Sequence, residues 1–191
     1  MNTYTTLGIV SGILCIFAFV PYIVSMYKKE ITPHPFSWFV WAMLGTVTLV
    51  TYIGVGAIET LPLAIVNFIG PFTIFLLTIK YWKGKFPKFD YICLAFSLLA
   101  IIIYVIYHNA AIALTVNLLG DFIAALPTIR KTYLDSSSEN LTTWILFTLG
   151  AIVSLFAIKD FSYGILIFPL YLVCFELLMC ALIIRGRYFR K

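Results

Sequence analysis

Charged residues are scarce in this sequence: only 11% of its 191 residues are Asp, Glu, Lys or Arg, whereas 62% are hydrophobic. Soluble domains contain about 25% charged and about 45–50% apolar residues. A soluble fold of this size would leave roughly a third of its surface in water, and this chain has too few polar side chains to cover it. The composition excludes a soluble enzyme, a nucleic-acid-binding protein and a secreted disulfide-rich domain. It predicts an integral membrane protein in a lipid bilayer.

Residues that bind metals or form disulfides are also few. The four cysteines lie inside apolar runs without metal or disulfide spacing, and there are only two histidines. No Ser–His, paired-Asp or His/Cys/Asp cluster stands out, which makes an intramembrane enzyme the least favoured class of function. The sequence therefore predicts no metal, no cofactor and no enzymatic activity. The N-terminus, MNTYTTLGIV, lacks the positive region of a cleaved signal peptide, so the first apolar run is predicted to be a permanent span.

Long apolar runs divide the chain into seven predicted transmembrane helices. A bilayer-spanning helix needs about 20 apolar residues, and charge, Pro or Gly interrupts the sequence between the runs. The predicted helices cover residues 5–27, 36–56, 60–82, 90–107, 110–130, 141–158 and 161–184. The fold class that follows is an all-α integral membrane protein.

The basic residues predict how these helices are oriented. Only Lys159 falls on one side of the predicted membrane, and the other side receives Lys28, Lys29, Lys80, Lys83, Lys85, Lys88, Arg130, Lys131, Arg185, Arg187, Arg190 and Lys191. Loops rich in Lys and Arg stay in the cytoplasm, so we expect the N-terminus outside and the C-terminus in the cytoplasm. That result requires an odd number of spans, in agreement with the count of seven.

The chain contains an internal repeat at an offset of 106 residues. Without a gap, the offset aligns Pro21, Tyr27, Ser37 and Trp38 with Pro127, Tyr133, Thr143 and Trp144. We therefore predict a first three-helix repeat at 1–86, a linker helix at 87–108 and a second three-helix repeat at 109–191. The linker helix inverts the chain once more, so both repeats point the same way, as in transporters built from parallel repeats.

The segments that carry the repeat are FVPYIVSMYKKEITPHPFSWFVWAMLG and ALPTIRKTYLDSSSENLTTWILFTLG. Their first-helix Pro, basic loop and Trp-containing entry to the next helix, together with the 3+1+3 plan, resemble the SWEET, SemiSWEET and PQ-loop superfamily of membrane transporters. That family has Gln after the Pro, where this chain has Tyr22 and Thr128. The resemblance implies alternating access, proline hinges, and an Asn on the third helix of each repeat that binds substrate. Asn67 matches that Asn in the first repeat.

Polar residues at membrane depth are the candidates for solute binding. Asp121 lies near the middle of the fifth predicted helix, where a carboxylate costs about 2.5–3.5 kcal/mol on insertion scales, and Asn117 lies one turn before it. Glu176 lies inside the last helix, where it could share a proton with Asp121, contact a backbone carbonyl or face a neighbouring subunit. The predicted substrate-binding residues are Asn67, Asn117, Asp121 and Glu176. Each could instead form only a structural hydrogen bond to a neighbouring helix.

Prolines and aromatic residues are the candidates for hinges and gates. Proline inside a helix removes one backbone hydrogen bond and kinks the helix, so hinges are predicted at Pro21, Pro71, Pro127 and Pro169. A static kink is the alternative. Residues that align between the repeats near the basic loops could gate a pathway or only anchor the helices at the interface: Trp38, Trp144, Tyr27 and Tyr133.

The sequence favours a small-solute carrier that moves a sugar or similar polar metabolite by alternating access. Asp121 makes coupling to protons a further hypothesis. The alternative is a non-transporting seven-helix membrane receptor or scaffold of the same fold. The expected partners are a small-molecule solute, protons and the lipid bilayer, with no nucleic acid. A duplicated unit can close a cavity alone, so a monomer would be sufficient.

Overall fold

The structure is a computed structural model that describes residues 2–31, 33–80, 88–107 and 109–188. Within these residues the chain is helical and has no strands. Its elements are α1 (Thr3–Tyr27), α2 (Pro35–Gly54), α3 (Leu61–Ile79), α4 (Lys88–Tyr107), α5 (Ala110–Leu134), the 3-10 turn η1 (Ser136–Ser138), α6 (Leu141–Phe156) and α7 (Tyr163–Tyr188).

The all-helical class is confirmed, and several of the helices have the length and composition of membrane spans. α1, α2, α3, α5 and α7 are each long and apolar enough to cross a bilayer, whereas α6 is apolar but has 16 residues. α5 runs to Leu134 and α7 to Tyr188, beyond their predicted ends at 130 and 184. The end of the third predicted span, most of the basic loop after it and His108 lie outside the described residues. The chain is thus a multi-pass membrane protein by its helices, and the number of spans stays a prediction.

Side chains that cap helix N-termini explain where several helices begin. Asn140 caps α6, because its side chain accepts a hydrogen bond from the backbone N–H of Thr143 at 3.1 Å. At the start of α2, His34 Nδ1 accepts from the N–H of Ser37 at 3.4 Å, and Pro35 occupies the first helical turn. Each cap satisfies one N–H that the first turn of a helix leaves without a partner.

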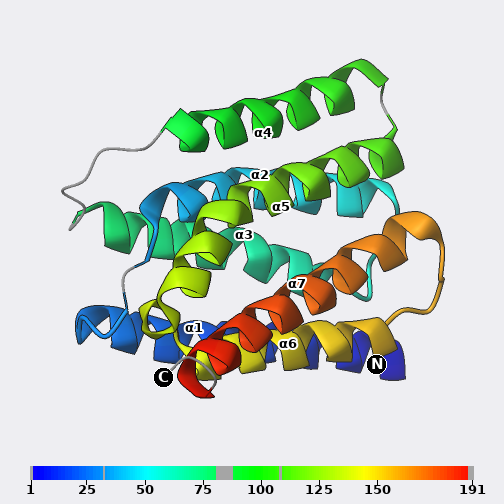
Figure 1. The fold of residues 1–191 in the computed structure, drawn as a ribbon. Helices are drawn as coiled ribbons and strands as arrows, with labels where there is room; N and C mark the ends of the chain where they lie inside the picture. Colours follow the sequence, from blue (N-terminus) through cyan, green and yellow to red (C-terminus); the bar gives the residue numbers. More distant parts are fainter. Residues whose placement is uncertain (1, 32, 81–87, 108, 189–191) are drawn as a thin grey trace.

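The helices pack as two groups with α4 at one edge (Figure 1). α3 contacts both α1 and α2, and α7 contacts both α5 and α6. Between the groups, α1 packs on α6 and α2 packs on α5, while α4 lies on α5 and α2. The start of α1 and the end of α7 lie at opposite ends of the bundle (Figure 1). We call the end that contains Lys28, Lys131 and Arg185 the basic end.

The bundle is apolar outside and partly polar inside, the reverse of a soluble protein. On α1, Ile16, Phe17 and Val20 are each more than half exposed. Small and polar residues lie between the helices, where Ser11 and Asn117 are fully buried. Membrane helices use such residues to approach closely and to hydrogen-bond across interfaces, so this distribution fits a surface that faces lipid.

Hydrogen bonds from side chains to backbone connect the two groups of helices, and a pair of them joins α1 to α6 and α5 to α2. Ser11 Oγ on α1 donates to the carbonyl of Gly150 on α6 at 2.8 Å. Asn117 Nδ2 on α5 donates to the carbonyl of Leu44 on α2 at 3.2 Å. α6 approaches α1 closely because position 150 is glycine, where a Cβ atom would overlap Cys15 Sγ and lie 3.2 Å from the carbonyl oxygen of Ser11. These bonds fix how α1 sits on α6 and how α5 sits on α2.

The prolines lie inside α1, α3, α5 and α7, as expected from their positions. α5, which contains Pro127, visibly bends along its length (Figure 1). In α7, Pro169 has no N–H to donate to the carbonyl of Ile165 one turn earlier. The hydroxyl of Tyr52 on α2 donates to that carbonyl at 2.7 Å. A neighbouring helix therefore satisfies the backbone group that the proline leaves free, as a membrane requires.

Replacing Tyr52 with Phe tests this compensation. Tyr52→Phe leaves the carbonyl of Ile165 buried without a donor, which costs about 1–3 kcal/mol of stability. We expect a lower apparent melting temperature for the purified protein in detergent. Tyr4→Phe, on an exposed part of α1, is the matched control and should melt like the wild type. Equal melting temperatures for the two variants would contradict the assignment.

Candidate functional site

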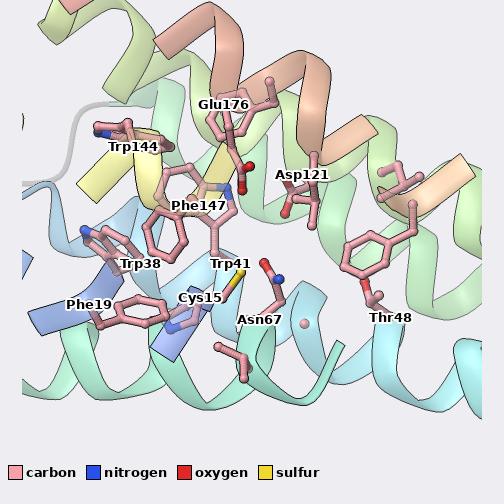
Figure 2. Close-up of a pocket in the computed structure, with 17 residues that line it drawn as sticks. Cys15, Phe19, Trp38, Trp41, Thr48, Asn67, Asp121, Trp144, Phe147 and Glu176 are labelled. Carbon is pink, nitrogen blue, oxygen red and sulfur yellow. The ribbon is translucent and has the colours of Figure 1, made fainter. Parts of the chain in front are cut away.

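A cavity of about 60 Å³ lies inside the bundle, between the two groups of helices. Its polar lining comes from α2, α3, α5 and α7, which contribute Thr48, Asn67, Asp121 and Glu176 respectively. Figure 2 shows the carboxyl groups of Asp121 and Glu176 and the amide of Asn67 turned toward the same space. Three residues expected to bind solute are therefore brought together, although they are 109 positions apart in sequence at the extremes.

The two carboxyl groups have different partners. Asp121 Oδ2 accepts a hydrogen bond of 2.6 Å from the hydroxyl of Tyr171, one helix away on α7. Glu176 is only 5% exposed, and its Oε2 atom has no hydrogen-bond partner among the described residues. No hydrogen bond among the described contacts joins Asp121 to Glu176, so the structure does not show the proton-sharing pair considered from the sequence. A buried carboxyl oxygen without a partner is costly, and Glu176 is therefore the less satisfied of the two acids.

The two asparagines occupy different positions. Asn67 lines the cavity and donates from Nδ2 to the carbonyl of Leu63 on its own helix at 3.1 Å. Asn117 does not line the cavity; its Nδ2 donates to Thr48 Oγ1 at 2.8 Å as well as to the α2 backbone. Because Thr48 lines the cavity, Asn117 supports the lining from behind.

Aromatic rings form a large part of the remaining wall. Trp38 and Trp41 meet edge to face with ring centroids 5.0 Å apart, and Trp41 meets Phe175 in the same way at 6.1 Å. Trp144 meets Phe175 at 5.6 Å and Phe147 at 6.0 Å. Edge-to-face contacts of this kind hold rings in fixed orientations, so the aromatic wall of the cavity has a defined shape.

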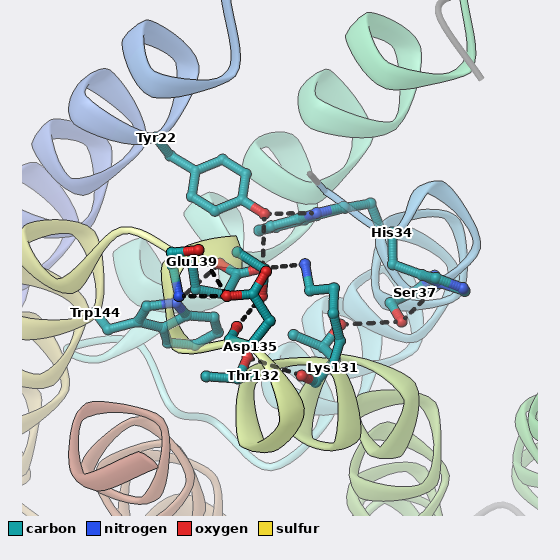
Figure 3. A network of polar contacts seen from close by, with 12 residues as sticks. Tyr22, His34, Ser37, Lys131, Thr132, Asp135, Glu139 and Trp144 are labelled. Atoms are coloured by element: carbon teal, nitrogen blue, oxygen red, sulfur yellow. Dashed lines mark hydrogen bonds and ion pairs between the residues drawn. The ribbon is translucent and has the colours of Figure 1, made fainter. Parts of the chain in front are cut away.

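A buried carboxylate, Glu139, lies at the basic end of the bundle, just before α6 (Figure 3). Lys131 Nζ donates to its Oε1 at 2.7 Å, and Trp144 Nε1 donates to its Oε2 at 3.1 Å. Tyr22 on α1 also donates to Oε1, at 3.4 Å, and in turn accepts from Trp38 Nε1 at 3.3 Å. We call these five residues the Glu139 network. It ties α1 and α2 to α5 and α6 through one acid that is 1% exposed.

Trp38 and Trp144 belong both to the wall of the cavity and to the Glu139 network. Both line the cavity, both are almost fully buried, and both donate their indole N–H to the network. This burial differs from that of an interfacial anchor, which places its ring at the lipid headgroups. We refer to these two residues as the Trp pair.

The remaining candidates lie in several environments. Pro71 lines the cavity, Pro169 is buried, and Pro21 and Pro127 are half-buried. Tyr27 and Tyr133 are exposed and do not line the cavity. Instead, the ring of Tyr133 lies under the guanidinium of Arg185, 3.8 Å from the ring centroid. The two tyrosines therefore lie at the surface of the basic end.

Sequence reasoning missed the network and the partner of Asp121. Glu139 stands in the polar loop DSSSEN, where nothing in the local sequence indicates that its side chain is buried. Tyr22 occupies the position where the resembled family has Gln, which is the one sequence signal that marks it. Nothing in the local pattern distinguishes Tyr171 from the other eleven tyrosines, because its role depends on how α7 packs on α5.

The described residues contain no group of three or more His, Cys, Asp or Glu that could hold a metal ion. Comparisons of the chain with protein-family models, curated proteins and solved structures give no match. The site is therefore interpreted from its own chemistry: two carboxyl groups and an amide in an aromatic cavity, above a buried polar network.

His34 lies near this network and titrates unusually. Burial, followed by the positive charge of Lys131, lowers its pKa from 6.5 to about 4. Between these two pH values the unfolded chain binds a proton that the folded protein excludes. Stability is therefore full above pH 6.5 and falls as the pH drops toward 4.

His34→Asn tests this linkage. Asn keeps a side-chain acceptor for the start of α2, as Asn140 does for α6, but does not titrate. We expect the apparent melting temperature of the variant to fall less than that of the wild type between pH 7 and pH 4.5. Identical losses in both proteins would show that the folded state does not exclude the proton from His34.

Proposed function

We propose that this protein is a small-solute membrane transporter that works by alternating access, with the central cavity as the solute site. The observation that carries the proposal is the convergence of Asn67, Asp121 and Glu176 from three helices on one internal space. Ionisable residues at membrane depth are expensive and usually mark a solute or proton pathway. The volume of about 60 Å³ is below the roughly 300 Å³ at which typical ligand pockets begin, which fits a closed state that must widen to load its solute.

The proposal includes seven spans arranged as two parallel repeats, α1–α3 and α5–α7, with α4 as the linker. The hydrogen bonds between the groups support it. Ser11 and Asn117 are separated by the repeat offset of 106, and so are their acceptors Leu44 and Gly150. The first helix of each unit packs on the second helix of the other unit: α1 packs on α6, and α5 packs on α2. This reciprocal packing is expected for two related units about a pseudo-twofold axis. This arrangement also supports the resemblance to the SWEET, SemiSWEET and PQ-loop superfamily as a proposal.

The Trp pair and the Glu139 network would form the gate at the basic end. Opening the cavity on that side requires Trp38 and Trp144 to separate, and the network holds both. Additional bonds across the groups reinforce this end, since Ser37 Oγ on α2 donates to the carbonyl of Ala124 on α5 at 3.0 Å. We propose that the basic end faces the cytoplasm, from the distribution of Lys and Arg. The prolines would act as hinges for the rocking of the two units.

Asp121 is the candidate for proton coupling. Its carboxyl group lies near the middle of α5 and bonds to Tyr171 on α7, so a change in its charge would alter a contact between two moving helices. A solute site in which one carboxyl exchanges a proton can return empty without carrying a net charge across the bilayer. Proton coupling requires an ionisable side chain at position 121, whereas a purely structural hydrogen bond to Tyr171 does not.

Uptake into proteoliposomes tests the transporter and its coupling together. We would measure radiolabelled glucose, sucrose, alanine and choline, with and without a gradient of about one pH unit. That gradient supplies about 1.4 kcal/mol per coupled proton, or about tenfold accumulation. We expect at least one solute to enter faster than in empty liposomes and to accumulate with the gradient.

Asp121→Asn should still let the solute enter the liposomes, but the accumulation of about tenfold that the pH gradient drives should be lost. Asp160→Asn, in a loop where Asp160 accepts from the N–H of Ser162, is the matched control and should behave as the wild type. Unchanged gradient dependence in Asp121→Asn would contradict the coupling. No flux of any solute above that of empty liposomes would favour the alternative, a receptor or scaffold of the same fold.

A further inference from the structure

The cavity is lined by two acidic side chains, with no basic counterpart among the described residues that line it. Its acids are Asp121 and Glu176, and no Lys, Arg or His is among the described residues that line it. Lys131, the basic residue of the Glu139 network, does not line the cavity and is paired with Glu139 at 2.7 Å. Any positive charge that balances the cavity acids must therefore come from a ligand or from protons.

Two buried polar atoms in the cavity wall lack partners and define what a ligand must offer. Glu176 Oε2 is an acceptor, and Trp41 Nε1 is a donor; neither has a hydrogen bond among the described residues. Glu176 is more than nine-tenths buried, and its carboxyl group points into the cavity (Figure 2). A ligand that brings a positive charge or a hydrogen-bond donor to Glu176 and accepts from Trp41 would compensate both atoms at once.

The aromatic wall favours an organic cation over a bare metal ion. Trp38, Trp41, Trp144 and Phe175 line the cavity, and the faces of such rings attract ammonium groups. A hard cation such as Ca²⁺ needs six or more oxygen ligands, and the described lining provides few oxygens beyond its two carboxyl groups and one amide. The wall and the acids together match a cation that is apolar around its charge.

We propose that the cavity binds a small organic ammonium ion that carries a hydroxyl or similar acceptor group, with Glu176 as its charge partner and the tryptophan rings around it. The ammonium group lies against Glu176, and its acceptor group receives the indole N–H of Trp41. This deepens the proposed function, on which it rests only in taking the cavity as the solute site. The proposed class of solute is thus an organic amine and not a sugar.

Binding can be measured without transport, because three of the four tryptophans line the cavity and report on it by fluorescence. We would titrate the purified protein in nanodiscs at pH 8 with choline and with protonated ethanolamine. The neutral isostere of choline, 3,3-dimethylbutan-1-ol, has the same shape and hydroxyl group without the charge. Glucose and sodium chloride complete the series.

We expect saturable quenching by at least one of the two cations, and binding of the neutral isostere about tenfold weaker than choline or worse. Glu176→Gln should weaken cation binding by about tenfold or more, and Trp41→Leu by several-fold. Asp160→Asn, outside the cavity, should bind as the wild type does. The comparison between choline and its isostere uses wild-type protein, so it decides the matter even if Glu176→Gln does not fold.

The proposal is overturned if neither cation binds saturably, or if glucose or the isostere binds as tightly as choline. Competition by sodium at equal concentration would also overturn it, since the site would then be one for inorganic cations. Cation binding without flux in proteoliposomes would leave the site in place and contradict the transporter. Flux of a neutral solute without cation binding would leave the transporter and contradict the ammonium site.

Discussion

The carboxylate of Glu139 is the point at which the basic end of the bundle is held together. It is 1% exposed and accepts hydrogen bonds from Lys131 on α5, Trp144 on α6 and Tyr22 on α1. A buried carboxylate is stable only when charge and hydrogen bonds compensate for its lost hydration, so each donor is constrained to stay in place. This requirement also holds the Trp pair, because Trp144 donates to Glu139 directly and Trp38 donates to Tyr22.

The need to compensate buried polar groups also applies to the rest of the interior. It distinguishes residues that support the structure from residues that are available to bind a solute. Where a proline removes a backbone donor, Tyr52 supplies one, and Asn117 satisfies the α2 backbone and Thr48 behind the cavity. Among the buried side-chain atoms that have no partner in the described part of the chain, Glu176 Oε2 and Trp41 Nε1 are the two whose residues line the cavity. Both face one cavity, which is where a solute would provide the missing bonds.

The sequence predicted the helical class and most helix limits, because runs of apolar residues broken by charge, Pro or Gly are strong local signals. It also located Asp121, since a single acid in an apolar run is conspicuous. It could not locate Glu139, whose burial depends on how a polar loop folds against α1 and α5. It could not place the aromatic wall either, because Trp38 and Trp144 have the same local pattern whether they face lipid or a cavity.

The central claim, that the Glu139 network closes a solute cavity at the basic end, is tested most directly by the reactivity of Cys15, which lines the cavity and is 1% exposed. In a protein that retains only this cysteine, a small membrane-impermeant methanethiosulfonate would be added from the side of the basic loops. We predict slow modification in the otherwise wild-type protein. Modification should be about tenfold faster or more in Glu139→Gln, and unchanged in Glu30→Gln, whose exposed acid lies 4.0 Å from Lys28. Equal rates in all three proteins would contradict the account.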